Sequence, residues 1–281
     1  MPQRPLVFLL FALPATLIFL LFFVGPFTYF GVMSFWSVSA YRLTPGFQFE
    51  NYLDVYNEYA YSLGFTFTIA LVIAIITTVI AFAFAYLIRF RAGRLGPLLL
   101  FITLITMFGG YLVKIYAWRT ILGSTGILNT GLMSLGVIDE PLPWLLYNPG
   151  AVVTTLTHFL LPFAVLPIYG SLRAINDSQL AAARDLGAGS SRALVDIILP
   201  QCELGLVVAF MLTFFIAAGD YITPRLVGGP STSMIGNFVE NQFITALNAP
   251  QSSALAIAIL LVCAGTILCV RFALRAALAV R

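Results

Sequence analysis

Apolar runs long enough to cross a lipid bilayer recur along this chain of 281 residues, and they restrict its fold more than any other feature. The hydrocarbon core of a bilayer is about 30 Å thick, so a helix that crosses it needs about 20 consecutive apolar residues. Charged residues make up only 9% of the chain, well below the roughly 25% found in soluble domains. Because backbone polar groups in lipid must be hydrogen-bonded within the protein, spanning segments of this kind are helices. The sequence therefore predicts an all-α membrane protein and argues against a soluble enzyme.

We expect six transmembrane helices in a single transmembrane domain that comprises residues 1–281. The predicted spans cover residues 6–30, 63–88, 98–118, 151–172, 204–224 and 253–272. The first of them follows Arg4, and Val38-Ser39-Ala40 resembles a signal-peptide cleavage site. However, its apolar stretch is longer than the roughly 7 to 15 residues of a signal peptide, which indicates a retained helix.

The orientation follows from the arginines, because basic residues in short loops are retained on the cytoplasmic side. With the N-terminus inside, most of them fall on that side: Arg4, Arg89, Arg91, Arg94, Arg173, Arg184, Arg192, Arg271, Arg275 and Arg281. Only Arg42 and Arg225 fall clearly outside. We therefore expect both termini in the cytoplasm. Since the net charge of +3 has this topological role, it does not indicate a nucleic-acid partner.

A polar insert, residues 176–200, separates the fourth and fifth predicted spans. Its charges exclude it from lipid and lie at Arg184, Asp185, Arg192 and Asp196. The alanines at positions 181–183 favour a first helix, which Gly187 can end in the left-handed conformation, and Pro200 can end or kink a second helix. The expected N-cap residues are Asp177 or Ser178 for the first helix and Ser190 or Ser191 for the second. Two short helices at an angle form a knob suited to a water-soluble partner.

The segment LAAARDLGAGSSRALVDIILP, residues 180–200, resembles the EAA loop of bacterial ABC-importer permeases. The positions that match the loop's pattern are Ala182, Ala183, Gly187, Ile197, Leu199 and Pro200. One position departs from it, because Ala181 stands where the family usually has Glu. The resemblance implies that the insert docks with an ATPase through Ala182, Ala183, Arg184, Asp185, Gly187 and Pro200. The departure at Ala181 implies that a charged contact usual in that docking is missing.

Two further regions are similar to the permeases of spermidine/putrescine importers and their relatives. They are YLVKIYAWRTILGSTGILN, residues 111–129, and GDYITPRLVGGP with MIGNFVENQF, residues 219–230 and 234–243. Together with the six spans, the resemblance covers nearly the whole chain. It implies a type I ABC importer permease fold and an importer for polyamines or similar cationic amines. Relatives in the same class carry other solutes, so an opine, an aminophosphonate, a metal ion or an oxyanion stays an alternative substrate.

Energy for transport must come from another subunit. A phosphate-binding loop needs Gly-Lys-Ser/Thr, and the chain's sole lysine, Lys114, is followed by Ile115. The resemblance implies a cytoplasmic ATPase dimer that holds ATP and Mg, with no cofactor in this chain. It also implies an extracytoplasmic binding protein, a second permease that is either a different chain or a copy of this one, and a bacterial inner-membrane location. An ion-coupled secondary transporter is the further alternative, although the paired repeats with broken helices typical of such proteins are not visible.

Asp220 is an acidic residue close to the apolar body of a predicted span, near the outer end of the fifth. Ionisable groups at membrane depth usually face a cavity or a partner. Asp220 can attract a cationic substrate, with Tyr221 as an aromatic wall and Glu240 as a second acid. Alternatively, Asp220 forms an ion pair with Arg225 or Lys114 that closes the outer gate. Lys114 on the substrate pathway would instead suit an anion, and a structural role is favoured for it.

The other polar groups in the spans indicate no catalytic or metal site. His158 is the only histidine, and we expect an interhelical hydrogen bond for it rather than a proton relay. Cys202, Cys263 and Cys269 lack a metal-binding spacing and are expected to be buried. Because no His pair, Ser/Lys dyad or paired carboxylates occur at membrane depth, an intramembrane enzyme is not expected.

Overall fold

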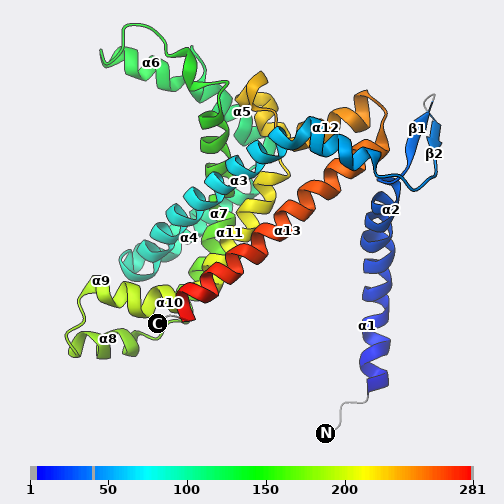
Figure 1. Ribbon diagram of the computed structural model, residues 1–281. Coiled ribbons are helices and arrows are strands. Elements are labelled where there is room, and N and C mark those ends of the chain that lie inside the picture. Colours follow the sequence, from blue (N-terminus) through cyan, green and yellow to red (C-terminus); the bar gives the residue numbers. More distant parts are fainter. Residues whose placement is uncertain (1–4, 40–41, 280–281) are drawn as a thin grey trace. The chain divides into compact units, whose positions relative to one another are not determined.

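The computed structural model describes residues 5–39 and 42–279, which are mostly helical (Figure 1). The chain divides into two compact units. The first comprises residues 1–61 and 238–261, and the second comprises residues 62–237 and 262–281. The helices α3 (Glu50–Phe90), α12 (Ile235–Glu240) and α13 (Ala249–Ala279) contribute residues to both units.

The first unit begins with a long apolar helix and a short hairpin. The helix consists of α1 (Pro5–Phe19), the π-helical turn η1 (Leu20–Val24) and α2 (Gly25–Met33). Within an 18-residue apolar window of residues 12–33, only 6% of positions are buried by protein. A helix that is apolar all round and uncovered by protein belongs in lipid, which fits the retained first span.

A two-stranded sheet follows, which was not predicted from the sequence. The strands β1 (Ser37–Ser39) and β2 (Arg42–Thr44) pair antiparallel, with Val38 opposite Leu43. The side-chain amide of Asn51, at the start of α3, donates hydrogen bonds to the carbonyls of Ser34 and Trp36, both at 2.8 Å. These bonds tie the beginning of α3 to the chain before the hairpin. The first unit also contains η7 (Asn241–Thr245), a π-helical turn after α12.

The second unit holds the remaining helices in chain order. They are η2 (Gly93–Leu95), α4 (Gly96–Phe108), α5 (Tyr111–Leu122), α6 (Ile127–Ser134), η3 (Pro143–Leu145), α7 (Pro149–Ala174), α8 (Asp177–Asp185), α9 (Ser190–Ala193), η4 (Leu194–Ile198), α10 (Leu199–Gln201), α11 (Glu203–Ala218), η5 (Pro224–Gly228) and η6 (Pro230–Thr232). Helices α7 and α11 pack side by side and form its core (Figure 1).

Among the described residues, four helices are long and apolar enough to cross a membrane, and the number reaches six if each of two bent pairs is one span. The first bent pair joins residues 93–108 to 111–134 at 99°, and the second joins residues 190–201 to 203–218 at 67°. The predicted spans over residues 6–30, 63–88, 151–172 and 253–272 fall within or nearly within continuous helices.

Two predicted spans have different ends in the structure. The third, residues 98–118, is not one straight helix, because α4 ends at Phe108 and α5 begins at Tyr111. The two residues between them are Gly109 and Gly110, which are poor helix formers. The fifth, residues 204–224, is shorter than predicted, since α11 ends at Ala218 and Gly219 is its C-cap.

The contact between α7 and α11 is close because of one glycine. A Cβ atom built on Gly205 would lie 2.7 Å from the carbonyl oxygen of Pro167 and 2.5 Å from Oγ of Ser171. Any side chain at this position would therefore push the two helices apart. Around this contact, fully buried side chains of α7 include Leu156, Leu160, Ile168 and Leu172.

One of the three cysteines does not fit the expectation that all are buried. Cys202 and Cys263 are buried, whereas Cys269 is exposed. Cys269 lies on α13, a helix whose apolar window is only 28% buried within the protein. A membrane helix with so little protein cover presents small apolar side chains to lipid, so exposure from protein is not exposure to water.

Candidate functional site

The polar insert folds as the sequence predicts in outline, but its first helix has a different cap. The N-cap of α8 is Asn176, whose Oδ1 accepts a hydrogen bond of 3.0 Å from the backbone N–H of Ser178. The predicted caps, Asp177 and Ser178, are the first residues of the helix instead. The carboxylate of Asp177 is engaged elsewhere, because it forms an ion pair of 2.7 Å with Arg89. The prediction of the cap was therefore wrong by one residue.

Gly187 ends this helix in the predicted left-handed conformation, with φ at +83°. The backbone N–H of Gly187 donates to the carbonyl of Arg184, and that of Ala188 donates to the carbonyl of Ala183, both at 2.9 Å. This pair of bonds is a Schellman motif, which satisfies the last carbonyls of a helix. A Cβ at Gly187 would meet no atom within 4 Å, so the surrounding space is open.

The second helix of the insert is capped by backbone alone. Gly189 occupies the N-cap of α9, with no side-chain bond, so the predicted caps Ser190 and Ser191 lie inside the helix. Pro200 lies in α10, and the chain bends by 67° between Gln201 and Glu203. This bend comes shortly after Pro200, as predicted, although Pro200 itself lies at the start of α10, where the missing N–H of a proline is tolerated.

The insert is attached to the helical body by apolar residues and turns its polar face outward. Leu180 and Ile198 belong to the same buried cluster as Leu172 of α7 and Ala209 of α11. By contrast, the predicted coupling residues Ala182, Arg184 and Asp185 are exposed, as is Gly187, while Ala183 and Pro200 are half-buried. The tip of the knob carries Leu186, which is 89% exposed. Leu186 and the charges of Arg184 and Asp185 are thus all accessible on the same exposed face of the insert.

Asp220 lies at the other end of α11, just after its C-cap, and is only 7% exposed. Its Oδ1 accepts hydrogen bonds from the Tyr111 hydroxyl at 2.5 Å and from the backbone N–H groups of Ile222 and Thr223 at 3.0 and 3.3 Å. The Tyr111 hydroxyl is also 3.0 Å from Oγ1 of Thr223. The other carboxylate oxygen, Oδ2, is buried and makes no hydrogen bond with any described residue. One acceptor of a buried carboxylate is therefore left open.

Lys114 lies on α5, near Tyr111 and Phe159, but does not pair with Asp220. Its Nζ is buried, has no hydrogen-bond partner among the described residues and lies 5.3 Å from the centre of the Phe159 ring. The Phe159 ring in turn packs on Tyr111, with centroids 4.7 Å apart. The predicted ion pair of Asp220 with Lys114 is thus not formed, because aromatic rings occupy the neighbourhood of the ammonium group. The pairing of Asp220 with Arg225 stays a prediction.

The remaining predicted residues are spread over several elements. Tyr221 is partly exposed, and its carbonyl accepts a hydrogen bond of 2.6 Å from the Asn237 side chain. Glu240 is the last residue of α12 and belongs to the first unit. In the part of the chain that the structure describes, His158 packs edge-on against Trp118 at 5.6 Å, and the interhelical hydrogen bond predicted for it is not formed.

Sequence reasoning missed Tyr111, Phe159 and Thr223 as members of the group around Asp220. Tyr111 opens α5 directly after the Gly109-Gly110 break, which turns it toward the end of α11. The pair of glycines was the signal that could have indicated a break in the third span. Nothing in the sequence indicated that this break would face Asp220.

The comparisons with known proteins agree with this architecture. Residues 90–277 match the sequence model of the family described as binding-protein-dependent transport system inner membrane component. The chain is 35% identical over 169 residues to the spermidine/putrescine transport system permease protein PotB of Salmonella typhimurium, covering 60% of this chain and 58% of that protein. The chain thus spans less than two thirds of the length of this relative.

Solved structures show the same fold at low sequence identity. A crystal structure of a bacterial ABC transporter involved in the import of the acidic polysaccharide alginate matches with a TM-score of 0.77 and 16% identity, covering 97% of this chain and 96% of that chain. The alginate transporter in complex with an alginate pentasaccharide-bound periplasmic protein matches with a TM-score of 0.76 and 17% identity, over 94% of this chain and 92% of that chain. At such identities the likeness establishes the fold alone.

Proposed function

The chain belongs to the family of binding-protein-dependent transport system inner membrane components, and from this membership we propose that it is a permease subunit of an ATP-driven ABC importer for polyamines. Proteins of this family are transport subunits of the inner membrane, and the type I importer permease fold of this chain agrees with that role. Polyamines or similar cationic amines are the proposed substrates. The observation that carries this proposal is the 35% identity to PotB, a permease of spermidine/putrescine transport.

ATP hydrolysis enters through the polar insert in this proposal. The exposed face with Arg184, Asp185 and the tip residue Leu186 docks into a cleft of a cytoplasmic ATPase dimer, which holds ATP and Mg. Because Leu180 and Ile198 fasten the insert to the cluster between α7 and α11, a displacement of the knob is transmitted to these helices. An ATPase with different affinities for the inward-open and outward-open states then shifts the equilibrium between them.

The other partners follow from the same importer class. We propose that residues 1–281 act as one permease domain, with both termini in the cytoplasm, and that it pairs with a second permease of a different chain. An extracytoplasmic binding protein delivers the substrate, in the way that the structurally similar alginate transporter forms a complex with a periplasmic protein. The substrate pathway lies between the two permeases.

Asp220 supports a cationic substrate. Its open oxygen, Oδ2, lies in a setting of aromatic rings that includes Tyr111. A carboxylate oxygen without a partner attracts an ammonium group, and aromatic faces stabilise the methylene chain and the charge of an amine. Tyr221 and Glu240 are the further residues proposed for this pathway.

A second candidate is the import of an anionic solute by the same class of transporter. It is favoured by Lys114, whose buried ammonium has no hydrogen-bond partner among the described residues. A buried cation without a partner favours binding of an anion. An aminophosphonate or another oxyanion would fit this chemistry, and the cognate binding protein distinguishes the two candidates by which class it binds.

The test is uptake by the reconstituted importer. Vesicles that contain the chain, its partner permease and the ATPase are given radiolabelled spermidine with the cognate binding protein. We expect uptake that depends on ATP and on the binding protein. Uptake that continues without the ATPase would exclude the ABC importer, and a binding protein that takes an aminophosphonate but no polyamine would exclude the polyamine.

A further inference from the structure

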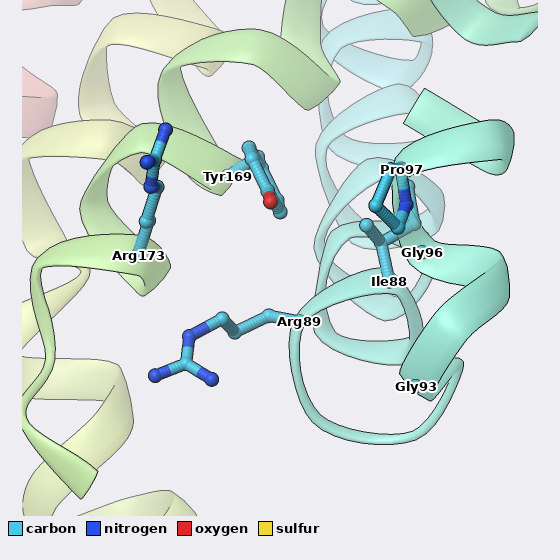
Figure 2. A pocket seen from close by; sticks show the side chains of 7 residues that line it. All are labelled: Ile88, Arg89, Gly93, Gly96, Pro97, Tyr169 and Arg173. Atoms are coloured by element: carbon cyan, nitrogen blue, oxygen red, sulfur yellow. The ribbon is translucent and has the colours of Figure 1, made fainter. Parts of the chain in front are cut away.

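A pocket that none of the proposed transport steps uses lies at the end of the second unit that carries the insert (Figure 2). Its volume is about 420 Å³, and it opens between the end of α3, the beginning of α4 and the C-terminal part of α7. Its lining includes Ile88, Arg89, Gly96, Pro97, Tyr169 and Arg173. A pocket of this size accommodates the head of a small ligand.

Two arginines give the pocket a cationic character. Arg173 is exposed and makes no hydrogen bond or ion pair with the described residues. The guanidinium of Arg89 lies 4.9 Å from the centre of the Phe90 ring, and only its Nη2 makes hydrogen bonds, to Oδ1 of Asp177 at 2.7 Å and to the carbonyl of Ile175 at 3.4 Å. The N–H groups on Nε and Nη1 of Arg89 have no partner among the residues described. In Figure 2, Arg89 extends from α3 across the opening toward the side that carries Tyr169 and Arg173.

The wall opposite α7 is the start of α4. A Cβ on Gly96 would lie 2.8 Å from the carbonyl oxygen of Ile88, so this glycine lets α4 begin directly against the end of α3. Helix α4 has 13 residues, and the positive end of its dipole adds to the attraction of an anion. This contribution is small beside that of two guanidinium groups, each of which can donate paired hydrogen bonds to phosphate oxygens.

The surface next to the pocket is apolar. At the start of α4 and along it, Leu95, Leu98, Phe101 and Ile102 are each half exposed or more. A cationic pocket that continues into an apolar helix face matches a molecule with an anionic head and hydrocarbon chains. A water-soluble phosphate would be bound by the arginines, but it has no hydrocarbon chain to bury against this helix.

We propose that the pocket binds the phosphate headgroup of an anionic phospholipid of the cytoplasmic leaflet, with Arg89 and Arg173 on the phosphate and the acyl chains along α4. The leaflet follows from the positive-inside placement of these arginines. The inference rests on the proposed membrane orientation and is independent of the transported solute and of ATPase docking. Arg89 would then contact both the headgroup and Asp177, the first residue of α8. A bound headgroup thereby restrains the beginning of the insert.

The test measures lipid retention by the full-length chain purified with its partner permease. The proteins are taken from nanodiscs with equal amounts of phosphatidylglycerol and phosphatidylcholine, and native mass spectrometry gives the ratio of the two lipids retained. Arg173→Gln is the variant of choice, because it removes a guanidinium group without breaking an ion pair. We expect it to lower the preference for phosphatidylglycerol about fivefold, which corresponds to about 1 kcal/mol for one basic residue at a membrane surface.

Two controls separate the pocket from general surface charge and from free phosphate. Arg192→Gln removes the same charge from the exposed insert, where Arg192 lies outside the pocket, and is expected to leave the lipid ratio unchanged. Millimolar inorganic phosphate is expected not to displace the lipid. Equal retention by wild type and Arg173→Gln, an equal loss in Arg192→Gln, or displacement by phosphate would each overturn the proposal. Since neither substrate nor ATPase is present, failure here is distinct from failure of the transport proposal.

Discussion

The insert of residues 176–200 and the group around Asp220 lie in the same unit and differ in how far apart in sequence the residues are that shape them. The insert is closed by bonds between near neighbours in sequence, such as those from Gly187 to Arg184 and from Ser178 to Asn176. Asp220 also accepts local bonds from the backbone N–H groups of Ile222 and Thr223, but the group is completed by the bond from Tyr111, which is 109 positions away in the chain. The first is therefore a local structure that rests on the body, and the second exists only when the body is assembled.

The two regions also differ in where they leave their charges. On the insert, Arg184 and Asp185 are exposed to water, where an unpaired charge costs little. Around Asp220, the unpartnered atoms are Oδ2 of Asp220 and Nζ of Lys114, and both are buried. Because a buried polar group without a partner is unfavourable, a ligand or a change of conformation is expected to satisfy them. This difference agrees with the proposal that the insert binds a protein partner and the Asp220 group a solute.

The largest effect on stability and uptake is expected at the contact between α7 and α11, because both the insert and the Asp220 group depend on it. Gly205→Val places a side chain against the Pro167 carbonyl and Ser171 of the neighbouring helix, and overpacking of this kind costs about 1 to 3 kcal/mol. We expect a lower thermal transition of the solubilised protein and loss of uptake. Gly170→Ala on α7 is the control, because a Cβ there meets nothing within 4 Å. Equal stability of the two variants would contradict the close packing.

The next effect tests the insert alone. Gly187→Trp adds a bulky side chain in open space at the expected docking face and is disfavoured by the positive φ. We expect transport-linked ATP hydrolysis to fall about thirtyfold, the loss typical of a hot-spot residue in an interface. Gly187→Asn should retain most of the hydrolysis, since Asn tolerates the left-handed conformation. Normal hydrolysis in Gly187→Trp, with the permease still assembled, would remove the docking role.

The third effect tests the Asp220 group with a matched pair of variants. Asp220→Asn removes the negative charge, whereas Tyr111→Phe removes one hydrogen bond to Oδ1 and keeps the charge. If Asp220 meets a cationic substrate, Asp220→Asn should reduce spermidine uptake about tenfold and Tyr111→Phe clearly less, since only Asp220→Asn removes the negative charge that attracts an ammonium group. Equal losses in the two variants would assign Asp220 a structural role only.

The smallest effect concerns the cap of α8. Asn176→Ala removes the acceptor for the Ser178 N–H, and loss of an N-cap costs about 1 kcal/mol. Hydrogen exchange of the α8 amides should become about fivefold faster, since local opening follows local stability. Ser178→Ala is the control, because its side chain is not the cap. Faster exchange in Ser178→Ala than in Asn176→Ala would restore the cap that the sequence had predicted.

The predictions from sequence succeeded where neighbouring residues carry the signal. Gly187 takes the left-handed conformation that the alanine run before it implies, and Pro200 precedes a bend. The predicted N-cap of α8 was wrong by one residue, because Asn, Asp and Ser are all good N-cap residues and follow one another at positions 176–178. Only the ion pair with Arg89, which engages the carboxylate of Asp177, distinguishes Asp177 from Asn176. The broken third span was missed because hydropathy averages over the Gly109-Gly110 pair.

By itself the sequence determined that this chain lies in a membrane, that its helices are apolar, and that a polar knob projects on the arginine-rich side. These are properties of composition and of residues a few positions apart, where hydrophobic transfer and local hydrogen bonding act. Only the tertiary structure decided that Tyr111 holds Asp220, that Lys114 rests on Phe159 instead, and that Arg89 and Arg173 share a pocket. Such contacts depend on which helix faces meet, and that is set by packing over the whole unit.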